Sequence, residues 1–385
     1  MRLQTTKENS MRLIEGIVSK STPATRKAAM YYKTEPFYTD TSKYTHTNNW
    51  EIVRAIEILN NKGFSVDLID RDNHSWSPKK DYDLFLGLGV GNSGKNFVRY
   101  AKASKAKIKV LLSMGPQPDI SNELVLKRYH EFYKRTGRYA PPTRTVSDVI
   151  GDKFLEIMSE TDFIFNIGEK ENESYKSFLK YGKPILHFYP AVSPSVNYDS
   201  SWSSTRSRNS FLCFAGNGLI CKGVDVVTEA FLKDTSKNLS ICGPPEPAFF
   251  DQYGDKIKNS KNIKYHGFVE PGGSLFNELA SKCSYVVFHS SAEGCCTSVA
   301  TAIKAGLVPV VNPWTGILTE GCGIRMSDDG DTVSVVSSAI EDATKLSTDE
   351  YNTLLQGTLE KSNIFTQSSY TKSYSSAIEE VIKRL

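Results

Sequence analysis

Short apolar runs alternate with amphipathic stretches along most of the chain, a pattern typical of βα units on a parallel sheet. In the stretch NWEIVRAIEILNNKG, for example, Ile52, Ala55, Ile56 and Leu59 repeat at helical spacing, and Gly63 follows as a stop signal. The pattern predicts strands over 28–32, 64–70, 83–88, 108–113, 162–167 and 184–189 in the first half, and over 211–216, 239–242, 262–267, 285–290 and 307–312 in the second.

The alternation breaks at 194–210, where Ser and Asn predominate and apolar residues are few. We expect an exposed linker there, between one domain over 1–193 and another over 211–366. The final segment, 367–385, has an amphipathic pattern, and we expect this helix to pack back on the first domain. A chain of 385 residues is longer than one core usually serves. The prediction is an α/β fold of two doubly wound, Rossmann-like domains that face a cleft, with ligands beyond the carboxyl ends of the strands.

Composition narrows the class of protein. Hydrophobic residues at 39% and charged residues at 23% indicate a soluble globular chain, and no apolar run approaches the roughly 18 residues of a membrane helix. The amino-terminal stretch lacks the apolar core of a secretory signal, and seven thinly spread cysteines favour a reducing compartment, the cytoplasm. Residues 1–200 carry 30 Lys and Arg against 23 Asp and Glu. This excess suits an anionic acceptor or membrane face; an ordinary solvated surface is the alternative.

The segment HSSAEGCCTSVATAIKAG, 289–306, carries two adjacent cysteines beside a histidine and a glutamate. A disulfide between neighbours strains the intervening peptide, and the spacing of Cys295 and Cys296 is not that of a zinc site. A cysteine nucleophile would need a base. His289 is close in sequence but falls on the strand side, with no residue in the pattern to orient it. Packing roles for both thiols are therefore favoured.

The same segment makes better sense as a backbone site for phosphate. A buried strand leaves through a small-residue turn into a helix that begins near Thr297 or Ser298 and stops at Gly306. The amino-terminal end of a helix presents N–H groups and a positive dipole to an anion. Gly294 lets a ligand approach the main chain, and Glu293 can accept hydrogen bonds from hydroxyls. The pattern predicts a site for a sugar carried on a diphosphate.

Five segments together resemble a known family: FAGNGLICKG (214–223), LSICGP (239–244), NIKYHGFV (262–269), LFNELASKCSYVVFHSSAEG (275–294) and AIKAGLVPVV (302–311). They follow the order and spacing of family 4 type glycosyltransferases of the GT-B fold, strongly over 211–312 and in outline elsewhere. The resemblance implies transfer of a sugar from a nucleotide-sugar donor, UDP- or GDP-linked, to a hydroxyl of a glycan or lipid-linked glycan, as in polysaccharide biosynthesis. It implies retention of anomeric configuration, no metal, no further cofactor and no nucleic-acid partner. It also suits a cytoplasmic enzyme in peripheral contact with the inner face of a membrane.

The resemblance also assigns roles to residues. Lys222 would neutralise the leaving diphosphate, and Glu293 would hold the hydroxyls of the donor sugar. The other expected donor-binding residues are glycines of two loops and the amide cradle: Gly216, Gly243, Gly294, Cys295, Cys296, Thr297 and Ser298. The chain departs from the family twice. Asn217 stands in the donor site in place of an arginine, and Thr301 stands in place of the second glutamate, which grips the ribose.

The first domain would bind the acceptor, and His46, in a long polar turn, is a candidate catalytic or acceptor-contacting residue. Two other functions stay open. GVGNSG, 89–94, is a literal G-x-G-x-x-G and raises the alternative of an NAD(P)-dependent oxidoreductase, although the next predicted strand ends at Ser113 and not at an acidic residue. Asn217 and Thr301 raise the alternative of a catalytically weakened module that only binds a sugar nucleotide.

Overall fold

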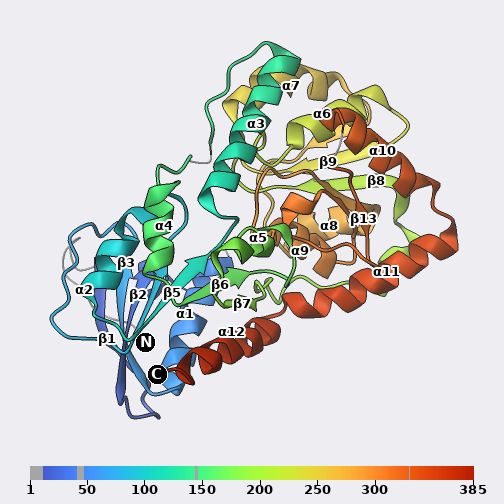
Figure 1. The fold of residues 1–385 in the computed structure, drawn as a ribbon. Helices are drawn as coiled ribbons and strands as arrows, with labels where there is room; N and C mark the ends of the chain where they lie inside the picture. The colour runs from blue at the N-terminus through green and yellow to red at the C-terminus, as the bar shows by residue number, and fades with distance from the viewer. Residues whose placement is uncertain (1–11, 41–46, 144–145, 329) are drawn as a thin grey trace. The chain divides into compact units, whose positions relative to one another are not determined.

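The computed structural model describes residues 12–40, 47–143, 146–328 and 330–385, and these form two compact units (Figure 1). Among the described residues, the first unit contains the chain up to Ile120, Ser147–Ala191 and Gln367–Leu385. The second contains Ser121–Val146 and Val192–Thr366. The last helix therefore groups with the first unit, whereas 121–146, which the sequence assigned to the first domain, groups with the second.

The first unit is built on a seven-stranded sheet in the order β1-β3-β2-β4-β5-β6-β7. Its first strand runs antiparallel to β3, and the remaining neighbours are parallel. The strand order reverses between β2 and β4, which makes that position a topological switch point. The strands are β1 (Leu13–Ile17), β2 (Arg26–Tyr32), β3 (Phe64–Asp70), β4 (Leu84–Leu88), β5 (Ile108–Ser113), β6 (Phe163–Ile167) and β7 (Ile185–Phe188).

Helices bury this sheet, and the last helix completes the core. Tyr370 and Tyr374 of that helix stack on one another with ring centroids 5.5 Å apart, and both meet Phe188 of β7 edge to face. The helices of the first unit are α1 (Thr47–Asn61), α2 (Phe97–Ala103), α4 (Asp152–Ser159), α5 (Glu173–Lys176) and α12 (Gln367–Ile382).

The second unit contains a parallel six-stranded sheet in the order β10-β9-β8-β11-β12-β13. Counted along the chain this is the order 3-2-1-4-5-6, so the switch point lies between β8 and β11, which pair directly. Every residue of β11 is buried, as expected for a central parallel strand. The strands are β8 (Ser207–Phe214), β9 (Asn238–Cys242), β10 (Ile263–Tyr265), β11 (Cys283–Phe288), β12 (Val308–Val311) and β13 (Ile324–Arg325).

The helices of the second unit have clear local start signals. Ser347, for example, accepts a hydrogen bond from the Glu350 amide, and the Glu350 carboxylate accepts one from the Ser347 amide, which is a capping box. The helices are α3 (Pro118–Thr136, whose residues from Ser121 belong here), α6 (Val224–Lys233), α7 (Pro247–Asn259), α8 (Ser274–Lys282), α9 (Thr297–Lys304), α10 (Thr332–Lys345) and α11 (Thr348–Ser362).

The α/β prediction with two doubly wound domains is confirmed, and each of the eleven expected strands is present with ends shifted by a few residues. The pattern missed β1 and β13, one interrupted by Gly16 and the other only two residues long. The expected linker over 194–210 is shorter than predicted. A 3-10 turn, Ser200–Ser204, and the first part of β8 fall inside it, because that strand begins with four polar residues, two of them exposed.

Candidate functional site

The candidate residues gather at the switch point of the second sheet. Two loops leave the carboxyl ends of the neighbouring strands β8 and β11, one over 215–223 and the other over 289–296. In an open α/β sheet the crevice beyond such a pair of strands is where ligands bind. The position therefore follows from strand order, which the sequence alone did not give.

The centre of the site is an ion pair between Lys222 of the first loop and Glu293 of the second. The lysine side chain is 14% exposed and the glutamate side chain 12% exposed. Ser290 Oγ donates a hydrogen bond to the same carboxylate oxygen, Glu293 Oε1, at 3.1 Å. A cation and a carboxylate thus lie in contact with one another beyond the carboxyl ends of β8 and β11, largely shielded from water.

Glycines let the first loop pass close to the second. Gly218 and Gly223 both have positive φ, +86° and +72°. A Cβ on Gly223 would lie 2.0 Å from the carbonyl oxygen of His289, so no side chain fits there. The Lys222 amide donates to Gly218 O at 3.0 Å and closes the turn. This backbone path brings the lysine to the second loop.

The second loop is held mainly through its main chain. The Glu293 amide donates to Trp314 O at 2.9 Å, and the Cys296 amide donates to Thr315 O at 2.8 Å. A Cβ on Gly316 would lie 2.2 Å from Gly294 O, which shows how closely the two segments approach. Of the amides in the predicted cradle, that of Cys296 therefore already has an acceptor within the protein.

Cys296 uses its N–H within the protein, as the cap residue of α9. The first amides of that helix, at Thr297 and Ser298, lie in the turn whose N–H groups have no acceptor inside a helix. The Ser298 amide also lies against the Cys296 thiol, whose charged form it favours.

Both cysteines of this loop are packing residues. Cys295 is 6% exposed and Cys296 is 2% exposed, and all seven cysteines are buried free thiols. Burial raises the pKa of Cys296 to about 11, against the neighbouring Lys222 charge, so its thiolate is scarce near neutral pH. Within the described ranges no three His, Cys, Asp or Glu side chains gather as a potential metal site.

The remaining sequence candidates have different surroundings. Asn217 is exposed, and Gly216 borders the lysine, with its Cβ position 4.0 Å from Lys222 Cε. Gly243 serves packing, since a Cβ there would lie 3.0 Å from Ala215 O. The hydroxyl of Thr301, 4% exposed, donates to Thr297 O of its own helix, so this residue does not replace the second glutamate of the family pattern. His46 lies outside the described residues.

Two of the three glycines of GVGNSG, Gly89 and Gly94, have close packing neighbours. A Cβ on Gly89 would lie 1.9 Å from Leu111 Cδ1, and one on Gly94 would lie 2.7 Å from Gly89 O. A 3-10 segment, Gly91–Asn96, separates the strand from α2, whereas a dinucleotide fingerprint leads directly into an α-helix. Packing thus accounts for Gly89 and Gly94, and Gly91 adopts a positive φ of +66°.

Sequence reasoning missed three residues that support the site. Asn312 Nδ2 donates to Ser290 O at 2.9 Å, and Ser290 in turn contacts Glu293. Arg128 of α3 donates to His289 O at 2.9 Å and contacts His289 Nδ1. The expectation that nothing orients His289 was therefore wrong. No local pattern could reveal Arg128, because it lies 161 residues away in the chain.

Comparison with known proteins identifies the fold. No family model and no curated protein sequence matches the chain. Among solved structures it is similar to sucrose-phosphate synthase from Thermosynechococcus elongatus (TM-score 0.60, 10% identity, 94% of this chain and 100% of that one) and to Anabaena HepE in complex with UDP-glucose (0.56, 13%, 94% and 100%). It is also similar to the pneumococcal O-GlcNAc transferase GtfA in complex with UDP and GlcNAc (0.52, 15%, 78% of this chain).

The match spans only 57% of the GtfA chain. At these identities the likeness establishes the fold and nothing finer. The protein has the GT-B fold of glycosyltransferases, with two Rossmann-like domains. This agrees with the fold that the five sequence segments implied.

Proposed function

We propose that this protein is a glycosyltransferase that moves a sugar from a nucleotide-sugar donor to a hydroxyl of a glycan or lipid-linked glycan. The observation that carries the proposal is the Lys222–Glu293 ion pair at the switch point of the second sheet. The second domain would bind the donor, and the first would bind the acceptor. UDP is the first nucleotide to test, because GtfA was solved with UDP and HepE with UDP-glucose. GDP is the second.

The chemistry follows from the charges of the two side chains. When the bond from the sugar to the diphosphate breaks, negative charge grows on the departing phosphate oxygen, and a nearby ammonium stabilises it. Lys222 would take this role, exchanging its contact with Glu293 for one with the diphosphate. The Thr297 and Ser298 amides of α9 would bind a second oxygen. Glu293 would then accept hydrogen bonds from the sugar hydroxyls.

We further propose that the reaction retains anomeric configuration. The departing diphosphate would accept the proton of the acceptor hydroxyl on the same face of the sugar, so the scheme uses no metal and no further cofactor. In this scheme Glu293 orients the sugar and forms no covalent bond.

For location, we propose a cytoplasmic enzyme in peripheral contact with the inner face of a membrane, in polysaccharide biosynthesis. The basic balance of residues 1–200 supports this. In the part of the chain that the structure describes, no helix is long and apolar enough to span a bilayer.

A module that binds the sugar nucleotide without turnover is the second candidate. Exposed Asn217 provides no cation, and Thr301 turns its hydroxyl back to its own helix. Both features would weaken the grip on the nucleotide while leaving Lys222 and Glu293 in place.

Thermal unfolding with a ligand panel tests these alternatives. The panel contains UDP, GDP, ADP and CMP, their common sugar conjugates, NAD and NADP. A ligand at about 100 times its dissociation constant stabilises the fold by roughly 2.7 kcal/mol, a shift of a few degrees. A shift with one nucleotide and its sugar, followed by transfer or slow hydrolysis, supports the transferase. A shift without turnover supports the module, and a shift only with NAD or NADP overturns both.

A further inference from the structure

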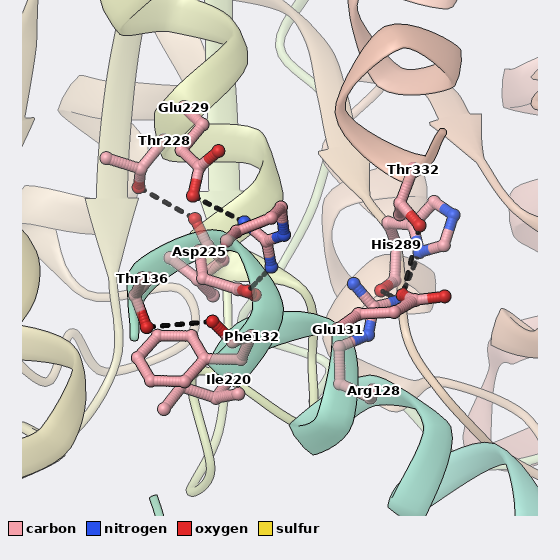
Figure 2. Close-up of polar contacts among 12 residues, drawn as sticks. Arg128, Glu131, Phe132, Thr136, Ile220, Asp225, Thr228, Glu229, His289 and Thr332 are labelled. Carbon is pink, nitrogen blue, oxygen red and sulfur yellow. Dashed lines mark hydrogen bonds and ion pairs between the residues drawn. The ribbon is translucent and has the colours of Figure 1, made fainter. Parts of the chain in front are cut away.

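The part of α3 that belongs to the second unit, from Ser121 onward, has a row of charged side chains. Arg128, Glu131 and Arg135 recur at spacings of three and four, so they lie on one face of the helix. Figure 2 shows this face of α3 with Arg128 directed at His289, and Glu131 close to Thr332 of α10. All of these residues belong to the same compact unit.

Two members of the row have ordinary structural partners. Arg135 forms ion pairs with Asp225 and Glu229, both on α6. Glu131 accepts a hydrogen bond from Thr332 Oγ1 at 3.0 Å. These contacts attach the helix to α6 and α10, and they compensate the charges that they bury.

Arg128 differs from both. It is only 4% exposed, yet no carboxylate among the described residues forms an ion pair with it, and its Nη1 has no hydrogen-bond partner there. Its Nη2 donates to His289 O at 2.9 Å and contacts His289 Nδ1. Burying this guanidinium is costly: burial lowers the pKa of Arg128, and the nearby carboxylates of Asp225 and Glu131 only partly oppose that shift. Simple attachment of the helix, which Arg135 already provides, does not explain that cost.

The carbonyl group that Arg128 binds belongs to His289, the first residue of the turn that carries Glu293. His289 directly follows β11, and its carbonyl oxygen also lies close to Gly223, 2.0 Å from the Cβ position of that glycine. Arg128 and Gly223 thus both lie against this peptide. Beyond it, Ser291 N donates to Cys221 O at 3.0 Å, which ties the turn to the loop of Lys222.

The turn then leads to the carboxylate. Ser290, whose carbonyl accepts from Asn312, donates through its hydroxyl to Glu293 Oε1. A change in the direction of the His289 peptide would shift Ser290, and with it the contact that sets the rotamer of Glu293. The geometry of the carboxylate therefore depends on the peptide that Arg128 binds.

We propose that Arg128 is a positioning residue for the donor sugar: by holding the His289 peptide, which packs closely against Gly223, it sets the turn that orients Glu293. The inference rests on the proposed function. It makes a specific distinction, because Glu293 would contact the sugar and Lys222 the diphosphate. Loss of Arg128 should therefore weaken binding of a nucleotide sugar more than binding of the bare nucleoside diphosphate.

The test is titration calorimetry with two matched probe pairs, UDP with UDP-glucose and GDP with GDP-mannose. Arg128→Met keeps the apolar stem and removes the donors. We expect the affinity of the sugar conjugate to fall about tenfold relative to that of its nucleotide, as from loss of hydrogen bonds to a charged group. Glu293→Gln should show the same selective loss, and Lys222→Ala should weaken both members of a pair.

Two further variants separate positioning from folding. Thr332→Val removes the hydrogen bond that Thr332 gives to Glu131 of α3, and it should leave the ratio of the two affinities unchanged. Arg128→Lys can still donate to His289 O and should restore part of the lost selectivity; it also serves if Arg128→Met does not fold.

The outcomes are distinct. If wild type binds a pair but Arg128→Met has an unchanged ratio, or weakens both members equally, the positioning role is overturned and the proposed function stands. If wild type binds neither pair nor any other nucleotide sugar, the proposed function fails and this inference fails with it.

Discussion

Lys222 and Glu293, 71 residues apart in the chain, form an ion pair where the loops after β8 and β11 meet. Neither partner is more than 14% exposed. Both charges of a pair this shielded have lost much of their hydration, so removal of one partner leaves the other with an uncompensated charge. Both the ion pair and the loops around it are therefore sensitive to mutation. Three predictions concern them, and a fourth concerns Glu51 of the first unit.

Lys222→Ala should lower turnover by about 100- to 1,000-fold, because the charge that develops on the leaving diphosphate loses its cation. Steady-state kinetics with the donor found by the ligand panel measures this. Lys282→Ala is the matched control, since it removes a lysine from an exposed pair with Glu278 and should have little effect. Near-normal turnover in Lys222→Ala would refute the role given to this lysine.

Cys295→Ala combined with Cys296→Ala should keep most of the activity. Both thiols are buried, and burial raises the pKa of Cys296, so neither is suited to act as a nucleophile. The loss of packing should lower the free energy of unfolding by about 1–3 kcal/mol, measured by denaturant titration. A folded double variant without activity would restore the thiol hypothesis.

Gly223→Ala should destabilise the protein by several kcal/mol and disturb donor binding. The new Cβ would meet His289 O at 2.0 Å, on a residue with φ +72°. Gly267→Ala is the control for backbone conformation alone. That glycine has the same φ but no atom within 4 Å of its Cβ position, so its variant should lose only about 1 kcal/mol. If the two variants lost the same free energy of unfolding, the close approach of Gly223 to His289 O would be contradicted.

Glu51→Gln should change how stability depends on pH. Burial raises the pKa of Glu51 to about 7, against the opposing effects of the Ala191 amide and Lys33. The folded state therefore retains a proton that the unfolded state releases near pH 4.3, and this contribution to stability is lost as pH rises from about 4.3 to 7.

The Glu51→Gln variant cannot titrate, and its side-chain oxygen can still accept from the Ala191 amide, which lies 2.8 Å from Glu51 Oε1. Urea unfolding at several pH values should show a flatter profile for the variant than for wild type between pH 4.5 and 7. Parallel profiles would contradict a raised pKa.

The sequence alone determined much of this protein, because its information is local. Apolar runs such as VLL in β5 and VVF in β11 are long enough to identify buried strands without any partner in view. The small-residue turn before α9 likewise predicted a phosphate-binding loop with Glu293 beside it. Lys222 was assigned from the resemblance of FAGNGLICKG, 214–223, to the family pattern.

Only the tertiary structure decided which segments meet. The order of strands placed β8 beside β11 and so brought Lys222 to Glu293. It also assigned 121–146 to the second unit, where Arg128 reaches His289 from a helix whose sequence looks like any solvated amphipathic surface. It also decided that the Thr301 hydroxyl donates to Thr297 O and that the Cys296 amide donates to Thr315 O. Such contacts join residues far apart in the chain, and periodicity records only which face of an element is buried, not what lies against it.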